Sequence, residues 1–224
     1  MSNKKHIIIL GHGEGDGGTS SSIYGISERE HLEKLGNELR KVIEFYGLSK
    51  DFDLIDDINV YRRNDFVKTP QRYKGKNVIE LHLNAFNGIA SGGEIIFGAG
   101  LSPDEMDLRF EKMLREDFGF RRYIVSDYYQ NPREAKRLGI NYRLVEYCFI
   151  DNEDDAKRFY SQEYYIAKRT IETIVGKKLI DSDVPPFTTN YIIQLGAFND
   201  YNKAQEELIK IRKDYPSAWI RKVK

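Results

Sequence analysis

Two histidines and two glutamates stand at positions in this sequence where side chains can do chemistry. His12 follows the apolar run IIIL and opens a glycine-rich loop, and His82 lies in the apolar segment IELHLNA. Glu28 comes after that loop, at the expected start of a helix, and Glu146 interrupts the apolar run RLVEYCF. A carboxylate in such a run is costly to bury unless it has a partner. These four residues are therefore the candidates for a functional site.

Two histidines and one glutamate form a typical ligand set for a catalytic zinc ion, which keeps a fourth position open. We predict that His12, Glu28 and His82 bind one Zn²⁺ ion and that Glu146 is the catalytic residue. Zinc lowers the pKa of a bound water to about 7 and polarises a substrate carbonyl. Glu146 would take the proton of this water and pass it to the leaving nitrogen. The expected chemistry is metal-assisted amide hydrolysis.

Each of these features also has a different interpretation when it is taken alone. A histidine at a strand end can be structural, and a glutamate in a first helical turn often only complements the helix dipole. Gly13, Gly15 and Gly18 fit the nucleotide-binding pattern G-x-G-x-x-G, but Glu14 and Asp16 inside the loop would repel a pyrophosphate. The expected helix also begins about ten residues too late for that motif. A phosphate site is therefore disfavoured.

The apolar pattern predicts an α/β fold with a mostly parallel sheet, whose strands bring these positions together. Short apolar runs predict strands over 6–11, 58–61, 77–85, 92–98 and 142–150. Helices are expected from Ser27 to Gly47, from Ser102 to Gly119 and over 152–176. Ser27 and Glu30 form a capping box at the first of these starts. The carboxyl ends of strands in such a sheet open onto the crevice where ligands bind.

Composition excludes several classes of function. The 35 basic residues balance 35 acidic ones among 224 residues, so bulk charge predicts no nucleic-acid partner. The single Cys148 forms no intrachain disulfide and is expected to be a small core residue, while His6 and His31 are expected to be structural or solvent-facing. No stretch approaches the roughly 20 apolar residues of a membrane helix, so membrane insertion is not expected. The short apolar run near the N-terminus predicts synthesis in the cytoplasm without a signal peptide.

The composition changes at DSDVPPFTTN, residues 181–190, where two prolines lie among polar residues. This segment is the expected linker between a domain over 1–180 and a smaller unit over 191–224. In the smaller unit, YIIQLGAF predicts a strand, NDYNKAQEELIKIRKDY a helix and SAWIRKV a second strand.

The segments IIILGHG, ISEREHL, IELHLNA and LVEYCFIDN resemble, in order and spacing, the zinc-dependent N-acetylmuramoyl-L-alanine amidases of the amidase-3 type. The resemblance covers about residues 6–176. It implies a six-stranded sheet flanked by helices, one zinc ion on His12, Glu28 and His82, and Glu146 as the catalytic glutamate. The implied substrate is bacterial peptidoglycan, cut at the amide between N-acetylmuramic acid and L-alanine.

Two departures from the family pattern and one rival ligand bear on the predicted site. Glu80 stands where many members carry serine, and it shares a strand face with His82, so it is expected to crowd or tune the zinc site. Glu30 is a rival to Glu28 as the second ligand. The segment 121–143 matches the family poorly, so substrate-binding residues are not assigned there.

The unit over 191–224 resembles half of a SPOR domain, a peptidoglycan-binding module built of two β-α-β halves. A single half leaves an exposed sheet edge and a thin core. We therefore expect it to dock on the first domain, to associate with a second copy, or to belong to a longer parent.

The predicted function is a cell-wall hydrolase for host cell lysis, made in the cytoplasm and active on the wall after release. A phage endolysin and an amidase freed by mother-cell lysis both suit this prediction. The alternatives are a non-catalytic cell-wall-binding protein and a zinc peptidase that cuts bonds of the stem peptide.

Overall fold

The computed structural model describes residues 4–13, 15–21, 23–180 and 201–211. The chain divides into two compact units, residues 1–185 and 186–224. In the second unit the description covers helix α9, Tyr201–Ile211, which lies within the predicted helix. The predicted linker over 181–190 and both predicted strands of the second unit lie outside the described residues.

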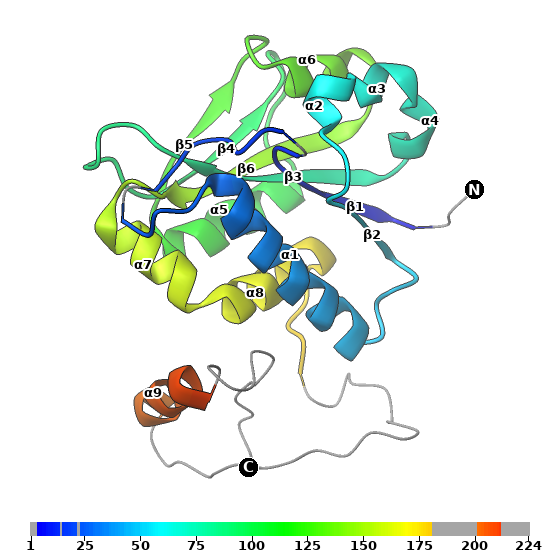
Figure 1. The fold of residues 1–224 in the computed structure, drawn as a ribbon. Coiled ribbons are helices and arrows are strands. Elements are labelled where there is room, and N and C mark those ends of the chain that lie inside the picture. The colour runs from blue at the N-terminus through cyan, green and yellow to red at the C-terminus, as the bar shows by residue number, and fades with distance from the viewer. Residues whose placement is uncertain (1–3, 14, 22, 181–200, 212–224) are drawn as a thin grey trace. The chain divides into compact units, whose positions relative to one another are not determined.

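The first unit is built on a six-stranded sheet with the strand order β2-β1-β3-β6-β4-β5 (Figure 1). Every pair of neighbouring strands is parallel except the pair β4 and β6, which is antiparallel. The predicted mostly parallel six-stranded sheet is therefore confirmed. The strands are β1 His6–Leu10, β2 Phe52–Ile55, β3 Asn77–Asn84, β4 Gly93–Phe97, β5 Phe120–Val125 and β6 Asn141–Phe149.

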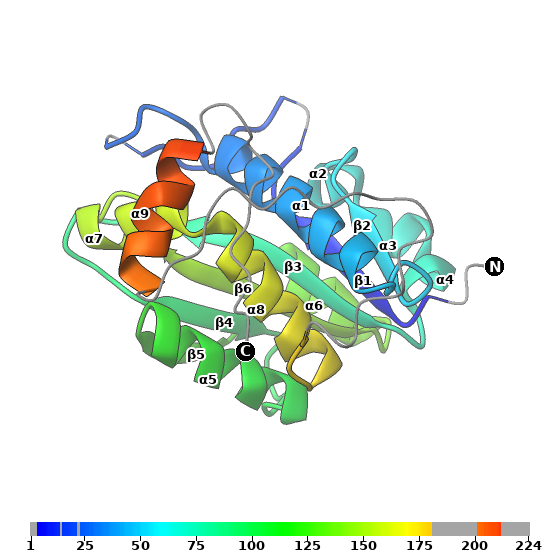
Figure 2. The same cartoon turned by 90° about the horizontal axis from the view of Figure 1, so that it is seen from below.

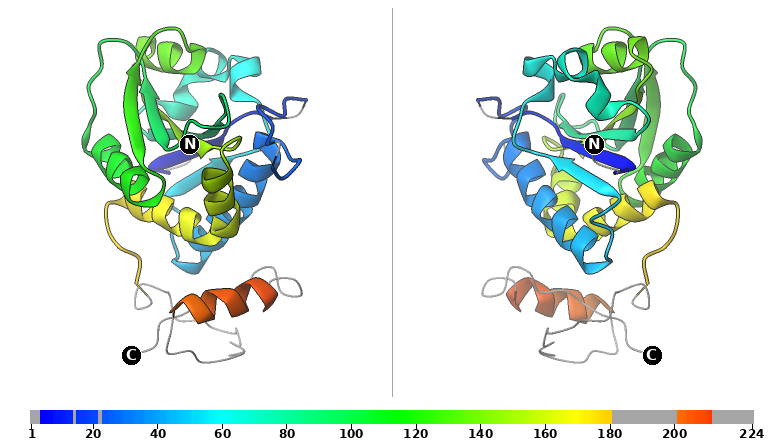
Figure 3. Two further views of the ribbon diagram at one scale, coloured as in Figure 1. Left: turned by 90° about the vertical axis from the view of Figure 1, so that its left-hand side faces the viewer. Right: turned by 90° about the vertical axis from the view of Figure 1, so that its right-hand side faces the viewer.

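Helices cover both faces of the sheet (Figure 1). We call the side covered by α1, α5, α7 and α8 the α1 face, and the side covered by α2, α3, α4 and α6 the α6 face; Figure 3 shows the two layers from both sides. On the α1 face, α8 packs between α1 and α5 (Figure 2). The helices are α1 Glu28–Phe45, α2 Val60–Arg63, α3 Asp65–Lys68, α4 Pro70–Tyr73, α5 Glu105–Asp117, α6 Gln130–Arg137, α7 Glu153–Ser161 and α8 Glu163–Val175.

Strand β1 shows how the core is divided between the two faces. Ile8 and Leu10 belong to the large apolar cluster of the α1 face, and Ile7 and Ile9 to the smaller cluster of the α6 face. All four side chains are at most 1% exposed. A strand buried on both faces needs apolar residues at every position, which explains the uninterrupted run IIIL.

A charged residue is also buried on the α1 face. Arg143 of β6 is 1% exposed, and its guanidinium donates hydrogen bonds to Asp107 at 2.6 Å and to Asp104 at 2.7 Å. Both aspartates belong to the capping box that starts α5. The arginine therefore anchors the N-terminus of α5 to the sheet.

The predicted strand over 58–61 is wrong. Val60 begins helix α2, because the side chain of Asn59 accepts a hydrogen bond from the backbone N–H of Arg62 and caps the helix. The strand at this edge of the sheet is the unpredicted β2, which pairs with β1. A local capping contact thus prevails over the strand preference of the apolar residues.

The other helix predictions are mostly correct, with changes at their ends. The Ser27–Glu30 capping box starts α1 as predicted. Helix α5 starts later than predicted, because Asp104 caps it in place of Ser102. The predicted long helix over 152–176 is two helices, α7 and α8, which break at Gln162.

In the described part of the chain, no helix combines the length and the apolar character that spanning a membrane requires.

Candidate metal and catalytic site

The two candidate histidines meet because their strands are neighbours. Strands β1 and β3 run parallel with Leu10 opposite Leu81, so His12 just past β1 lies beside His82 in β3. Their ring centroids are 4.9 Å apart. His12 has a φ of 63°, in the left-handed region, where the chain leaves the strand and turns into the loop.

Glu28 connects the two histidines. Its Oε2 atom lies 3.0 Å from Nε2 of His12, and its Oε1 atom lies 2.9 Å from Nδ1 of His82. The carboxylate also accepts hydrogen bonds from the backbone N–H groups of Leu83 at 2.9 Å and Thr19 at 3.2 Å. Helix α1 thus presents a buried, fully oriented carboxylate from its first turn.

The electrostatics of this group favour a positive charge. Burial raises the pKa of Glu28, but hydrogen bonds to His12 and His82 outweigh it and hold that pKa well below its usual range. Burial lowers the pKa of both histidines, yet the bonds to carboxylates leave both values raised, that of His82 strongly. The group therefore favours a positive charge, whether a proton or a metal ion supplies it.

Two glycines make room for these side chains. A Cβ atom on Gly11 would lie 2.5 Å from Nε2 of His82. A Cβ atom on Gly18 would lie 2.5 Å from Oε2 of Glu28 and 2.6 Å from Nε2 of His12. These distances are far below van der Waals contact. Only glycine at these positions therefore allows the backbone to pass directly against Glu28 and the two histidines.

His12, Glu28 and His82 fit a metal ion by their donor chemistry. One ligand atom from each residue lies within 4.8 Å of the others. Two imidazole nitrogens and one carboxylate oxygen suit zinc and leave a fourth position for a substrate or water. The group can therefore hold a metal ion. Glu30, the rival ligand, instead accepts a hydrogen bond from the backbone N–H of Ser27 in the capping box.

Glu146 lies next to this group on the α6 face. It pairs in register with His82 of β3 on one side and with Glu94 of β4 on the other. Its Oε2 atom is buried and has no hydrogen-bond partner among the described residues. Burial raises the pKa of Glu146 to about 8, and the nearby Glu28 and Glu94 carboxylates add to this effect. The carboxyl group is thus adjusted to exchange a proton near neutral pH.

Glu94 is a buried carboxylate that the sequence analysis overlooked. It is 2% exposed, and it accepts hydrogen bonds from Arg122 at 3.0 Å, Arg121 at 3.2 Å and Asn84 at 3.2 Å. A signal was present, because Glu94 interrupts the apolar segment GGEIIFG in the same way as Glu146 interrupts its own strand. Unlike Glu146, it is neutralised by its neighbours.

His31 and Cys148 lie in the core. Cys148 is 0% exposed, as expected for a small core residue. His31 is 1% exposed, and neither ring nitrogen has a hydrogen-bond partner in the described parts of the chain. Burial lowers the pKa of His31 to about 4. Three aromatic rings surround the imidazole, those of Tyr24, Phe159 and Tyr160.

Comparisons with known proteins identify the family of this chain. Residues 7–175 match the Amidase_3 family, whose description is N-acetylmuramoyl-L-alanine amidase. The chain belongs to this family. The match spans the whole sheet and contains all four candidate site residues.

Among the relatives of this amidase-family chain is the probable autolysin PH of Staphylococcus aureus (strain NCTC 8325 / PS 47). The two are 28% identical over 167 residues, which cover 68% of this chain and 34% of the autolysin. The chain therefore spans about a third of the length of that relative.

Solved structures of an endolysin domain and of an amidase share the fold. The catalytic domain of an endolysin targeting Clostridia Difficile superposes with a TM-score of 0.61 at 22% identity, covering 79% of this chain and 99% of that domain. The catalytic domain of the amidase CwlV from Bacillus (Paenibacillus) polymyxa var. colistinus gives a TM-score of 0.62 at 15% identity, covering 77% of this chain and 97% of that domain.

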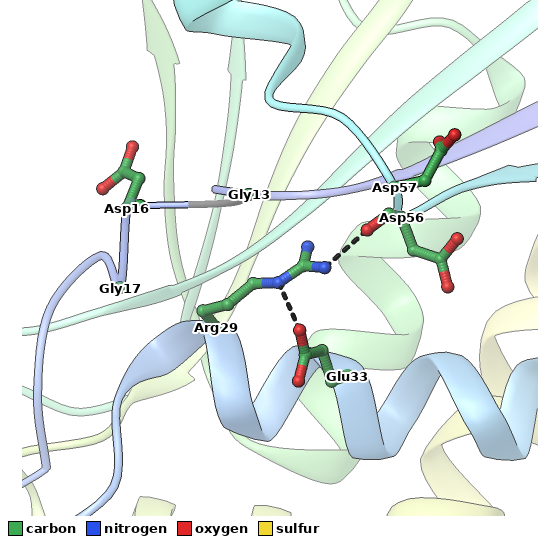
Figure 4. Close-up of a pocket in the computed structure, with 8 residues that line it drawn as sticks. Gly13, Asp16, Gly17, Arg29, Glu33, Asp56 and Asp57 are labelled. Carbon is green, nitrogen blue, oxygen red and sulfur yellow. Dashed lines mark hydrogen bonds and ion pairs between the residues drawn. The ribbon is translucent and has the colours of Figure 1, made fainter.

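An acidic cavity of about 540 Å³ lies beside His12 in this amidase-family domain (Figure 4). Arg29 of α1 points into it and donates hydrogen bonds to Glu33, to the backbone oxygen of Asp56 and, at 3.4 Å, to the backbone oxygen of His12. Arg29 therefore ties the turn at His12 to the helix that carries Glu28. The cavity is lined by Gly13, Gly15, Asp16, Gly17, Arg29, Glu33, Asp56 and Asp57.

A second hollow of about 440 Å³ lies along β5. Its lining includes Arg122, which is bonded to Glu94, and Tyr129, which starts α6. Burial raises the pKa of the Tyr129 phenol, and the negative charges of Glu146 and Glu94 raise it further. An aromatic ring and a cation thus stand close to Glu146, in the segment that resembles the family poorly.

Proposed function

We propose that this protein is a zinc-dependent N-acetylmuramoyl-L-alanine amidase, which hydrolyses the amide between N-acetylmuramic acid and L-alanine in bacterial peptidoglycan. The observation that carries the proposal is the position of Glu146 directly beside the His12–Glu28–His82 group, with a buried Oε2 atom that has no hydrogen-bond partner among the residues described. Membership of the amidase family and the similarity to an autolysin support the same reaction.

In this proposal His12, Glu28 and His82 hold one zinc ion. Zinc bound there would polarise the scissile carbonyl and make the attacking water more acidic. Glu146 accepts the proton of that water at its carboxylate and then donates it to the leaving nitrogen of L-alanine. Burial raises the pKa of Glu146 and so favours the protonated form that the second step requires.

A positive charge on the His12–Glu28–His82 group would lower the pKa of Glu146, because opposite charges stabilise the ionised form. The charge on the neighbouring group therefore controls whether Glu146 starts the reaction as a base. The negative charge of Glu94 raises the pKa of Glu146 instead. The hydrogen bonds of Glu94 to Arg121 and Arg122 limit that effect. These residues set the balance between the base and acid forms of Glu146.

The biological role that we propose is lysis of the cell wall after release from the cytoplasm. We also propose that residues 191–224 form a half SPOR-like unit that binds peptidoglycan and supports self-association. Pelleting on purified walls, for the whole chain and for residues 1–185, tests the first property. The mass in solution over a hundredfold range of protein concentration tests the second, because a constant monomer mass contradicts association.

The experiment that tests the activity measures new N-terminal amines on purified peptidoglycan. The protein is used as isolated, after chelation, and after zinc is returned. New L-alanine amines that disappear with the chelator and return with zinc are expected. Amines of another residue would identify a peptidase. Walls that bind the protein without any new amine would indicate a non-catalytic binding protein.

A further inference from the structure

Each of the two histidines contacts a second carboxylate through its other ring nitrogen. Nδ1 of His12 lies 3.2 Å from Oδ1 of Asp16, and Nε2 of His82 lies 3.0 Å from Oε1 of Glu80. Both rings are therefore held between Glu28 on one side and an outer carboxylate on the other. The two outer carboxylates differ in how firmly the protein holds them.

Glu80 is held on all sides. It is 3% exposed, and Asn131 of α6 donates to both of its oxygens, at 2.8 and 3.1 Å. The hydroxyl of Tyr142 in β6 donates to Oε2 at 2.6 Å. A buried carboxylate with this many donors remains ionised and has little freedom to move. Its free acceptor direction faces His82.

Asp16 is held more loosely. Its side chain is 23% exposed and lies in the loop after β1. It accepts hydrogen bonds from Asn59 at 2.9 Å and from the backbone N–H of Gly18 at 3.3 Å, and the Nε atom of Arg62 is 3.5 Å away. Water competes for such a group, so we expect it to orient His12 less strongly.

We propose that Glu80 is a positioning residue, which fixes the ring of His82 so that its Nδ1 atom faces the metal site. The proposal rests on the zinc site proposed above. An ionised carboxylate only accepts hydrogen bonds, so the ring nitrogen that contacts Glu80 must carry the proton. Nδ1 faces Glu28, so zinc bound at this group would take the place of a proton on Nδ1, while the Nε2 proton stays hydrogen-bonded to Glu80. An outer carboxylate also makes the imidazole a stronger ligand, and losing such a partner typically weakens metal binding about 10- to 100-fold.

Two residues of the segment 121–143 take part in this function. Asn131 and Tyr142 both belong to it, and both hold Glu80. The residue that replaces the common serine and the segment that departs from the family pattern are therefore parts of one network. In this chain that network supports the metal site from the α6 face.

The test is the zinc affinity of the whole chain, measured by competition with a chromophoric chelator. The variant Glu80→Gln keeps the size of the side chain but removes its charge, and we expect zinc to bind at least tenfold more weakly. Tyr142→Phe removes one hydroxyl and should weaken zinc several-fold; it remains informative if Glu80→Gln does not fold. Asp155→Asn is the matched control, because Asp155 is 1% exposed and holds Ser91 and Gly92 rather than a histidine.

A second readout separates orientation from general loosening. In the zinc-loaded protein the Nε2 proton of His82 should exchange slowly with solvent, and it should exchange faster in Glu80→Gln, as seen in the nitrogen-15 spectrum of the imidazole. Wild-type zinc affinity in both Glu80→Gln and Tyr142→Phe would overturn this inference and leave the amidase proposal intact. A wild-type chain that binds no zinc would overturn both.

Discussion

Two ionisable side chains on opposite faces of the sheet, Arg143 and Glu146, have contrasting surroundings. On the α1 face, Arg143 is enclosed by Asp104 and Asp107, so its charge is neutralised within an apolar core. On the α6 face, Glu146 keeps an oxygen without a partner in the described structure. Ionising such a carboxyl group lowers the stability of the fold.

This difference separates the two tasks of the domain. The α1 face supplies most of the apolar burial, and its charges stabilise the position of α5. The α6 face carries Glu94 and Glu146 opposite each other on β4 and β6, and Glu80 two residues before His82 on β3. Proteins often hold unfavourable groups at the site of their chemistry and compensate elsewhere. Variants on the two faces should therefore affect different properties.

The largest effect is expected for Glu146→Gln. The release of L-alanine amines should fall by about 10³-fold, because the amide side chain neither accepts nor donates the transferred proton. The free energy of unfolding at neutral pH should stay equal or rise, because the raised pKa of the Glu146 carboxyl group opposes folding there and the amide does not ionise. Glu105→Gln, at an exposed position in α5, is the control. Normal amine release by Glu146→Gln would refute the role of this residue.

The opposite pattern is expected for Arg143→Met. Removing the arginine leaves Asp107 buried without its partner, so the free energy of unfolding should fall by about 3–5 kcal/mol in urea titrations. The folded fraction should still release amines at the normal rate. Arg143→Met combined with Asp107→Asn should recover part of the lost stability. If Arg143 acted only as a surface charge, its removal would lower the free energy of unfolding slightly, and the loss would depend on the salt concentration.

The third prediction concerns acid stability. The pKa of His31 is about 4 in the folded chain, and burial is the main cause, while a histidine in an unfolded chain has a pKa near 6.5. The unfolded state therefore binds the proton more readily between pH 6.5 and 4. The free energy of unfolding should fall through this window by up to about 3 kcal/mol from this group.

His31→Leu isolates that contribution from other titrating groups. The positive charge of Lys34 adds to the lowered pKa, and Glu30 partly opposes it, so both residues are kept unchanged. Urea titrations of the two proteins at pH 7 and pH 4.5 provide the comparison. Wild type should lose more stability on acidification than His31→Leu, and equal losses would contradict the prediction.

The smallest effect is expected when alanine replaces one of two glycines that have similar φ angles. Gly18 has a φ of +67° and Gly25 a φ of +65°, but only Gly18 lies against Glu28 and His12. Alanine at either position should cost roughly 1–2 kcal/mol of backbone strain. Gly18→Ala should also weaken zinc binding by about tenfold, or about 1.4 kcal/mol, relative to Gly25→Ala. Equal zinc affinities of the two variants would show that the loop adapts without moving the ligands.

The strands at the centre of the sheet could be predicted because each is an apolar run buried on both sides. The edges could not be predicted in the same way. Strand β2 has four residues, and β5 contains Arg121 and Arg122, so neither carries a continuous apolar signal. The break at Gln162 has no glycine or proline to announce it. These features depend on packing between distant segments.

The candidate site also combines residues that could be predicted with contacts that could not. His12, Glu28, His82 and Glu146 are detectable because a polar residue at a strand end or within an apolar run is conspicuous. The contacts of Glu80 could not be predicted from the sequence, because Asn131 and Tyr142 reach it only after α6 and β6 have packed on β3. A shared strand face predicted that Glu80 and His82 would meet, but not what else would hold the carboxylate.

The left-handed backbone of His12 restricts which residues evolution can place there. Non-glycine residues pay roughly 1–2 kcal/mol in this conformation, and asparagine, aspartate and histidine tolerate it best. A cysteine or glutamate would meet this penalty before making any contact with a metal ion. The turn thus selects among the possible ligand types through its φ angle, which makes a thiolate variant of this centre difficult to reach by single substitutions.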